Sequence, residues 1–135
     1  MTQLQNPKRL FPMILSEKLA ATKDFYTKAG FSVVFDMPEY LQVAYGPEKL
    51  DLCFMQPHQG SAGQAYPRFA GRGVVVSIPT DNADEKCAEL KAKGIEVFNE
   101  LEDKPWGWRS FHVVDPNGVI LDFFHVYKEP PKPQA

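Results

Sequence analysis

The alternation of apolar and polar residues along the chain predicts two helices and eight strands in a repeated order. Runs of strand length are rich in β-branched and aromatic residues, whereas two segments place apolar residues every three or four positions. The predicted strands are 10–15, 31–36, 40–45, 50–55, 74–78, 95–98, 109–114 and 119–126; the predicted helices are 17–29 and 83–93. The pattern is β-α-β-β-β, twice.

The predicted helix ends follow known capping chemistry. Ser16 is placed to cap the first helix, and Asn82 with Glu85 three residues later resembles a capping box at the start of the second. Gly30 and Gly94 are placed to end the two helices in a left-handed conformation.

The two halves also share residues. YTKAGFSVVF (26–35) parallels LKAKGIEVFN (90–99), and LDL (50–52) parallels LDF (121–123). We therefore predict an α+β fold in which two tandem β-α-β-β-β modules form a curved mixed sheet around a cleft, with the helices outside.

Length and composition favour a single domain over residues 1–135. The first module covers about 10–55 and the second about 74–127. Between them, 56–73 is a glycine-containing connector, and 128–135 (KEPPKPQA) is expected to be a disordered tail.

Charge and hydropathy exclude several classes of function. A net charge of -2 provides no basic surface for nucleic acid. No apolar run is long enough to span a membrane and no signal-peptide pattern is present, so we expect a cytoplasmic protein. Cys53 and Cys87 lack metal-ligand spacing and are expected to be buried apolar residues.

Asp122 is the main candidate for a functional residue. It interrupts the otherwise apolar run 119–124, where a carboxylate costs several kcal/mol unless it faces water, a partner or a ligand. His112, on the preceding strand, is a candidate for the same site and for general-base chemistry.

Several aromatic residues are candidates for a ligand-binding wall. Trp106, Trp108, Phe111 and Tyr45 can stack on an aromatic ligand, or equally fill the core. Arg109 is either a solvated charge at a strand end or an anchor for an anion.

Three motifs carry a resemblance to a known family. DFYTKAGF, TDNADEKCAELKAKGIEV and PWGWRSFHVVDPNGVILDFF, within residues 10–127, resemble the vicinal oxygen chelate superfamily, which groups glyoxalase I, bleomycin-resistance proteins, fosfomycin-resistance enzymes and extradiol dioxygenases. The chain is most similar to the bleomycin-resistance-like members. The resemblance implies paired modules, often in a homodimer, with clefts inside half-open barrels.

Metal-using members of that superfamily hold an ion with four ligands. The resemblance places the four positions at Phe11, at Asp51 or Leu52, at Val75 or Val74, and at Asp122. Phenylalanine, leucine and valine cannot ligate, so only Asp51 and Asp122 remain as weak metal candidates. Because catalytic sites normally keep at least three protein ligands, no cofactor is expected, with a divalent metal as the alternative.

Two functions remain open. The first is metal-free binding of a small hydrophobic, aromatic or cationic molecule in an aromatic-lined cleft. The second is a metal-dependent lyase, isomerase or dioxygenase of the glyoxalase type, so whether the protein is an enzyme stays undecided at this point. We expect a homodimer, whose modules pair either within one chain or between two.

Overall fold

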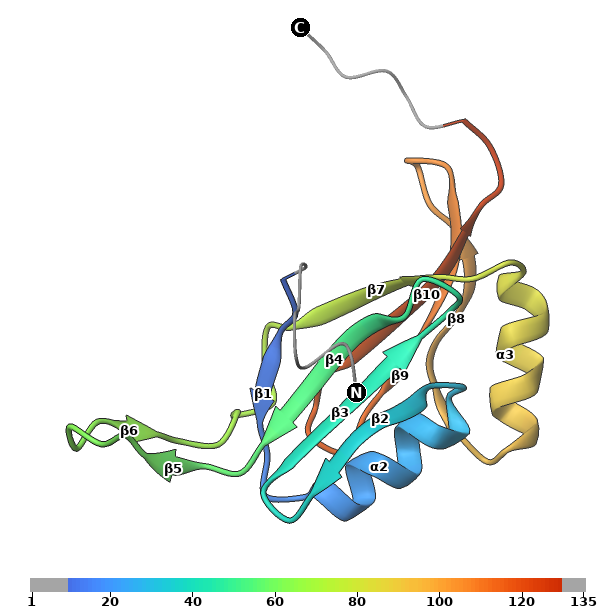
Figure 1. The fold of residues 1–135 in the computed structure, drawn as a ribbon. Helices are drawn as coiled ribbons and strands as arrows, with labels where there is room; N and C mark the ends of the chain where they lie inside the picture. Colours follow the sequence, from blue (N-terminus) through green and yellow to red (C-terminus); the bar gives the residue numbers. More distant parts are fainter. Residues whose placement is uncertain (1–9, 130–135) are drawn as a thin grey trace, which may run out of the picture. The chain divides into compact units, whose positions relative to one another are not determined.

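The chain divides between Ala70 and Gly71 into two compact units, called unit 1 and unit 2 (Figure 1). The computed structural model describes residues 10–129. Residues 1–9 and residues 130–135 of the predicted tail lie outside the described residues.

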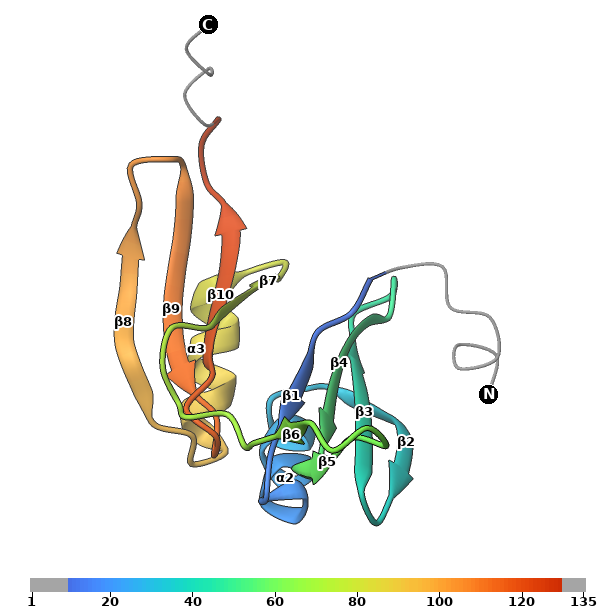
Figure 2. The same cartoon turned by 90° about the vertical axis from the view of Figure 1, so that its left-hand side faces the viewer.

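Unit 1 contains a four-stranded sheet and one helix. Its elements are β1 (Met13–Leu15), α2 (Leu19–Lys28), β2 (Ser32–Met37), β3 (Tyr40–Tyr45) and β4 (Leu50–Met55). The strand order is β1-β4-β3-β2, with β1 parallel to β4 and the other pairs antiparallel (Figure 2).

Helix α2 packs on one face of this sheet through aromatic contacts. The Tyr26 ring, fully buried, lies 4.9 Å from the ring of Phe31 and 5.1 Å from that of Phe54 in β4. The helix begins later than predicted: Lys18 is the N-cap, and the hydroxyl of Ser16 accepts from the Lys18 N–H. Ser16 therefore orders the turn before the helix but is not its cap.

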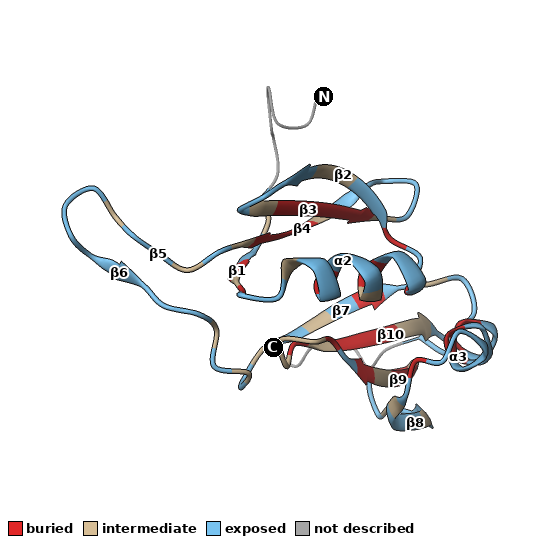
Figure 3. Cartoon of the chain, turned by 90° about the horizontal axis from the view of Figure 1, so that it is seen from below, coloured by how far each residue is buried: buried red, intermediate tan, exposed pale blue. Residues whose placement is uncertain are grey.

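Unit 2 repeats this arrangement. Its elements are β7 (Val75–Pro79), α3 (Ala83–Ala92), β8 (Val97–Asp103), β9 (Trp108–Val114) and β10 (Ile120–Val126). The strand order β7-β10-β9-β8 has the same pattern of one parallel and two antiparallel pairs. The predicted duplication of a β-α-β-β-β module is confirmed, and buried residues gather on the central strands of each sheet (Figure 3).

Helix α3 contacts its sheet through a hydrogen bond and a cation–π contact. The Ala83 N–H, in the first turn, donates to Nδ1 of His125 in β10 at 2.8 Å. The ammonium of Lys86 lies 5.4 Å from the ring centre of Phe123. Asn82 accepts from the Glu85 N–H, as the capping pattern predicts. Phe123 therefore marks the face of the sheet that α3 covers.

Two segments contain more strand than predicted. Residues 99–103, which follow the predicted strand 95–98, belong to β8, an edge strand with two irregularities in register. An edge strand tolerates charged side chains, so the acidic residues of β8 gave its sequence the composition of a loop. The connector also contains a short hairpin, β5 (His58–Gln59) and β6 (Ala65–Tyr66).

The cysteines behave as predicted. Cys53 and Cys87 are buried free thiols, and burial raises the pKa of both. Within residues 10–129, neither α2 nor α3 is long and apolar enough to cross a membrane.

The turn between β9 and β10 depends on glycine. The Asp115 carboxylate accepts from the N–H groups of Asn117 and Val119 at 2.7 and 2.9 Å. Gly118 follows at φ +93°, and a Cβ placed on it would lie 2.7 Å from Cα of Gly71. Only glycine fits this conformation and this close approach.

Replacing Gly118 with alanine should destabilise the protein more than replacing Gly94. Both glycines have positive φ, which costs an alanine about 1–2 kcal/mol, but a Cβ placed on Gly94 would have no atom within 4 Å. Gly118→Ala must also displace backbone, so we expect its loss in unfolding free energy to exceed that of Gly94→Ala by about 1–3 kcal/mol. Urea unfolding measures both; equal losses would contradict the close approach.

Candidate functional site

The alternation of side chains along β10 separates its residues into two faces. Phe123 contacts α3 and stacks on Phe111 of β9 at 5.5 Å between ring centres. Asp122 and Phe124 point to the opposite side, since successive side chains in a strand alternate. We call this side the helix-free face of unit 2, and the corresponding side of the other sheet the helix-free face of unit 1.

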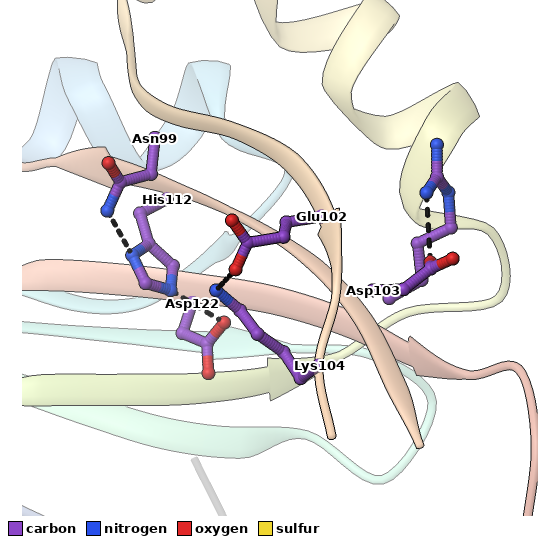
Figure 4. Close-up of polar contacts among 7 residues, drawn as sticks. Asn99, Glu102, Asp103, Lys104, His112 and Asp122 are labelled. Carbon is purple, nitrogen blue, oxygen red and sulfur yellow. Dashed lines mark hydrogen bonds and ion pairs between the residues drawn. The ribbon is translucent and has the colours of Figure 1, made fainter. Parts of the chain in front are cut away.

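Asp122 is the centre of a polar row that crosses all four strands of unit 2. Its Oδ2 accepts from Ser77 Oγ of β7 at 2.9 Å, and its Oδ1 lies 3.1 Å from His112 Nε2 of β9. Nδ1 of His112 in turn lies 3.1 Å from the Asn99 amide nitrogen of β8 (Figure 4). The residue Asp122 is 8% exposed, so its carboxylate is buried but partnered.

The His112 ring lies between two side chains of the row. The Asn99 amide nitrogen is a donor, so its contact with Nδ1 of His112 is compatible with a ring that donates from Nε2 to Asp122. A carboxylate has about four acceptor sites, so it can also accept from a ligand.

Aromatic rings continue the helix-free face along β9 and β10. Trp108 and Phe124 are stacked, with ring centres 3.6 Å apart and planes 10° apart. Trp106 lies edge-on to Trp108 at 6.2 Å and is 48% exposed. Because Phe124 is two residues from Asp122 on the same face, the stack starts about 7 Å from the carboxylate.

Three other predicted site residues are not on this face. Phe111 is buried against Phe123 on the α3 side. Arg109 donates to Asp84 of α3 at 2.7 Å and to Asp103 at 2.9 Å, contacts that raise the pKa of its guanidinium. Strand alternation therefore places both side chains on the face opposite to Asp122 and His112.

Tyr45 is the third of these residues, and it belongs to unit 1. Its ring lies 4.9 Å from that of Phe31, which contacts Tyr26 of α2. Tyr45 therefore packs on the α2 side of its own sheet and not on the helix-free face of unit 1.

The helix-free face of unit 1 has its own polar group. Asp51 accepts from the Gln42 amide nitrogen at 3.1 Å, and the Tyr40 hydroxyl lies 3.0 Å from Gln42 Oε1 and 3.2 Å from Cys53 Sγ. Burial, followed by the contact with Cys53, raises the pKa of the Tyr40 phenol well above its ordinary value. Leu52, the alternative to Asp51 for the second ligand position, is buried on the α2 side.

The side chains around Asp122 do not fit a catalytic metal ion. His112 and Asp122 are bonded to each other, and their neighbours in the row are a serine and an asparagine. Within the described part of the chain, no group of three or more His, Cys, Asp or Glu residues could hold a metal ion. Fewer than three such ligands is below what catalytic sites normally use.

The sequence did not identify Ser77, Asn99 and Phe124 as members of the site. Phe124 is two residues from Asp122 in the same strand, so the alternation of side chains would have placed both on one face. Ser77 and Asn99 are placed by pairing between strands, with Asp122 opposite Ser77 and Asn99 opposite His112. The sequence pattern of a single strand does not specify which residues of the neighbouring strand lie opposite its own.

The chain belongs to the Glyoxalase/Bleomycin resistance protein/Dioxygenase superfamily, whose family model matches residues 11–123. The match confirms the resemblance carried by the sequence motifs. No curated protein matches this chain significantly.

Solved structures with the same fold include proteins of different activity. A glyoxalase/bleomycin resistance protein/dioxygenase from Nocardioides is 23% identical, with 96% of this chain and 91% of the other covered and a TM-score of 0.76. The antibiotic-binding protein TnmS3 from Streptomyces is 25% identical (90% and 97% covered, TM-score 0.68). A lactoylglutathione lyase from Agrobacterium tumefaciens is 20% identical (89% and 94% covered, TM-score 0.68).

The raised pKa of Tyr40 predicts a loss of stability at alkaline pH. The folded state holds the phenol protonated, so its contribution is complete below about pH 10, the ordinary tyrosine value, and decreases as pH rises above it. Urea unfolding between about pH 8 and about pH 11 should show a steeper decline for the wild type than for Tyr40→Phe. Parallel declines would show that Tyr40 ionises equally in both states.

Proposed function

We propose that the protein binds a small organic cation with aromatic surface, without a metal ion, at the helix-free face of unit 2. The observation that carries the proposal is Asp122, a buried carboxylate that accepts from Ser77 and contacts His112 beside a stack of aromatic rings. Binding of this kind would sequester the ligand and requires no chemical step.

The charge of the site favours a cation. The row around Asp122 contains no lysine or arginine, because its other members are Ser77, His112 and Asn99. Lys104, which follows β8, is paired with Glu102 at 2.6 Å, a contact that lowers the pKa of Glu102 (Figure 4). A ligand cation can therefore offset the charge of Asp122.

The aromatic rings supply the remaining attraction. The exposed Trp106 and the stacked Trp108 and Phe124 offer ring faces and edges to a planar ligand. A cation over such a ring gains about 0.5–2 kcal/mol, and the gain is larger for tryptophan. A molecule that combines a positive charge with an aromatic body spans the distance of about 7 Å from Asp122 to the stack.

Two further points favour binding over lyase chemistry. The side chains at the family's ligand positions include Phe11 and Val75, and the residues around Asp122 lack a third metal ligand. The name of TnmS3, whose fold this chain shares, describes an antibiotic-binding protein. We extend that activity to this chain only as part of the proposal.

Asp122→Asn should weaken binding of ethidium, an aromatic cation, by about tenfold, equivalent to about 1.4 kcal/mol. The substitution keeps the size of the side chain and removes its charge. Fluorescence titration of the full chain measures the affinity, with urea unfolding as a check that the variant is folded.

Asp36→Asn is the matched control for this experiment. Asp36 is paired with Lys23 at 2.7 Å and is about half exposed, on the α2 side of unit 1. The Asp36→Asn substitution should leave the ethidium affinity within about twofold of the wild-type value. Equal effects of the two substitutions, or no binding of ethidium to the wild type, would contradict the proposed site.

A further inference from the structure

The turn between β9 and β10 contains a chemically reactive pair of residues. Of the four asparagines in the chain, Asn117 is the one that precedes a glycine. The backbone nitrogen of the following residue can attack the side-chain amide of an asparagine, and glycine hinders this attack least because it has no Cβ. Asn117 is half-buried, so water reaches the turn. Asn117 is therefore the asparagine of this chain at which such a reaction meets the least steric hindrance.

Asp115 holds both groups that the reaction needs. The nucleophile would be the nitrogen of Gly118, and its N–H donates to the backbone carbonyl of Asp115 at 3.1 Å. The amide under attack belongs to Asn117, and its Nδ2 lies 3.4 Å from Oδ2 of Asp115. The Asp115 carboxylate also accepts from the Asn117 N–H at 2.7 Å, and the residue is 4% exposed. The reaction therefore requires a local opening of the turn.

We propose that Asn117 is a site of spontaneous deamidation and that Asp115 sets its rate by holding the turn closed. When the turn opens, the Gly118 nitrogen forms a bond to Cγ of Asn117. The Cγ–Nδ2 bond breaks, and Nδ2 leaves as ammonia with the proton that the Gly118 nitrogen gives up. The product is a five-membered succinimide ring.

Water then opens the succinimide ring in one of two directions. Attack at Cγ leaves an aspartate in place of the asparagine. Attack at the backbone carbonyl carbon leaves an isoaspartate, whose main chain runs through Cγ and is longer by one methylene group. Both routes consume one water molecule from the solvent and require no oxidant, reductant or cofactor. The inference does not depend on the ligand proposed for unit 2.

Neither product fits the turn as asparagine does. Each replaces the Nδ2 donor with a carboxylate beside that of Asp115, and two like charges this close repel each other. The added methylene of isoaspartate also lengthens a tightly packed turn, in which a Cβ placed on Gly118 would lie 2.7 Å from Cα of Gly71. Deamidation should therefore loosen the connection between β9 and β10, the strands that carry His112 and Asp122.

Peptide mapping of the aged full chain by mass spectrometry tests the site. Asn82 and Asn99 precede alanine and glutamate and serve as internal references in the same sample. Asn117 should deamidate about tenfold faster than either, because glycine follows it. Isoaspartate should be present among its products. Equal rates at the three asparagines would overturn the assignment of the site.

Two variants test the role of Asp115. Asp115→Ala removes the side-chain acceptor and should speed deamidation of Asn117 by about fivefold, because the turn opens more often. Asp115→Asn keeps a side-chain acceptor and should give a rate between those of the wild type and Asp115→Ala. It adds no second reactive pair, because the next residue is a proline without an N–H. Wild-type rates in all of these comparisons are measured on the folded chain.

The wild type alone also tests the role of Asp115, even if Asp115→Ala does not fold. Deamidation of Asn117 should be about tenfold faster in concentrated urea than in the folded chain. Equal rates in the two states would show that the folded turn does not protect Asn117, and would overturn the role of Asp115.

The effect of the modification on stability is measured on aged protein. The modified chains, which carry an additional negative charge, are separated by anion exchange and should unfold at a lower urea concentration than the unmodified chains. Asn117→Gln is the control, because a glutamine would have to form a less favourable six-membered ring, and its unfolding should not change with age. Identical unfolding of modified and unmodified chains would overturn the predicted loosening of the turn.

Discussion

The register of β10 between β7 and β9 is the constraint on which the candidate site depends. It places Asp122 opposite Ser77 and His112, and at the same time places Leu121 and Phe123 in the core beside α3. A slip of one residue would reverse both faces. The slip would expose apolar side chains worth about 1.5–3 kcal/mol each and would bury a carboxylate without partners. The packing of α3 on the opposite face therefore also fixes the position of Asp122.

Unit 1 uses the same design with different side chains. Its central strands turn Leu41, Val43 and Phe54 toward α2 and turn Gln42 and Asp51 the other way. In both units a carboxylate on the helix-free face accepts from an uncharged side chain, Gln42 in unit 1 and Ser77 in unit 2, and aromatic rings lie on the same face. The two modules therefore share the kind of side chains on this face as well as their fold.

Much of the fold was predictable from the periodicity of the sequence. The errors in the prediction have physical causes. β3 and β4 have the predicted bounds because their alternation is regular and they pair on both sides. β8 was predicted too short because an edge strand carries charges that resemble a loop. The alternation within β9 would have separated Phe111 from His112. The contacts of Ser77 and Asn99 depend on register between strands, which a single strand does not specify.

Intermolecular nuclear Overhauser effects can locate an aromatic cation on the protein. With ethidium bound to the isotope-labelled full chain, we expect effects from ethidium protons to the ring protons of Trp108 and His112. Phe111, on the α3 side of the same strand, should give none. Effects to Phe111 or to α3, without any to Trp108 or His112, would show that the helix-free face of unit 2 is not the binding surface.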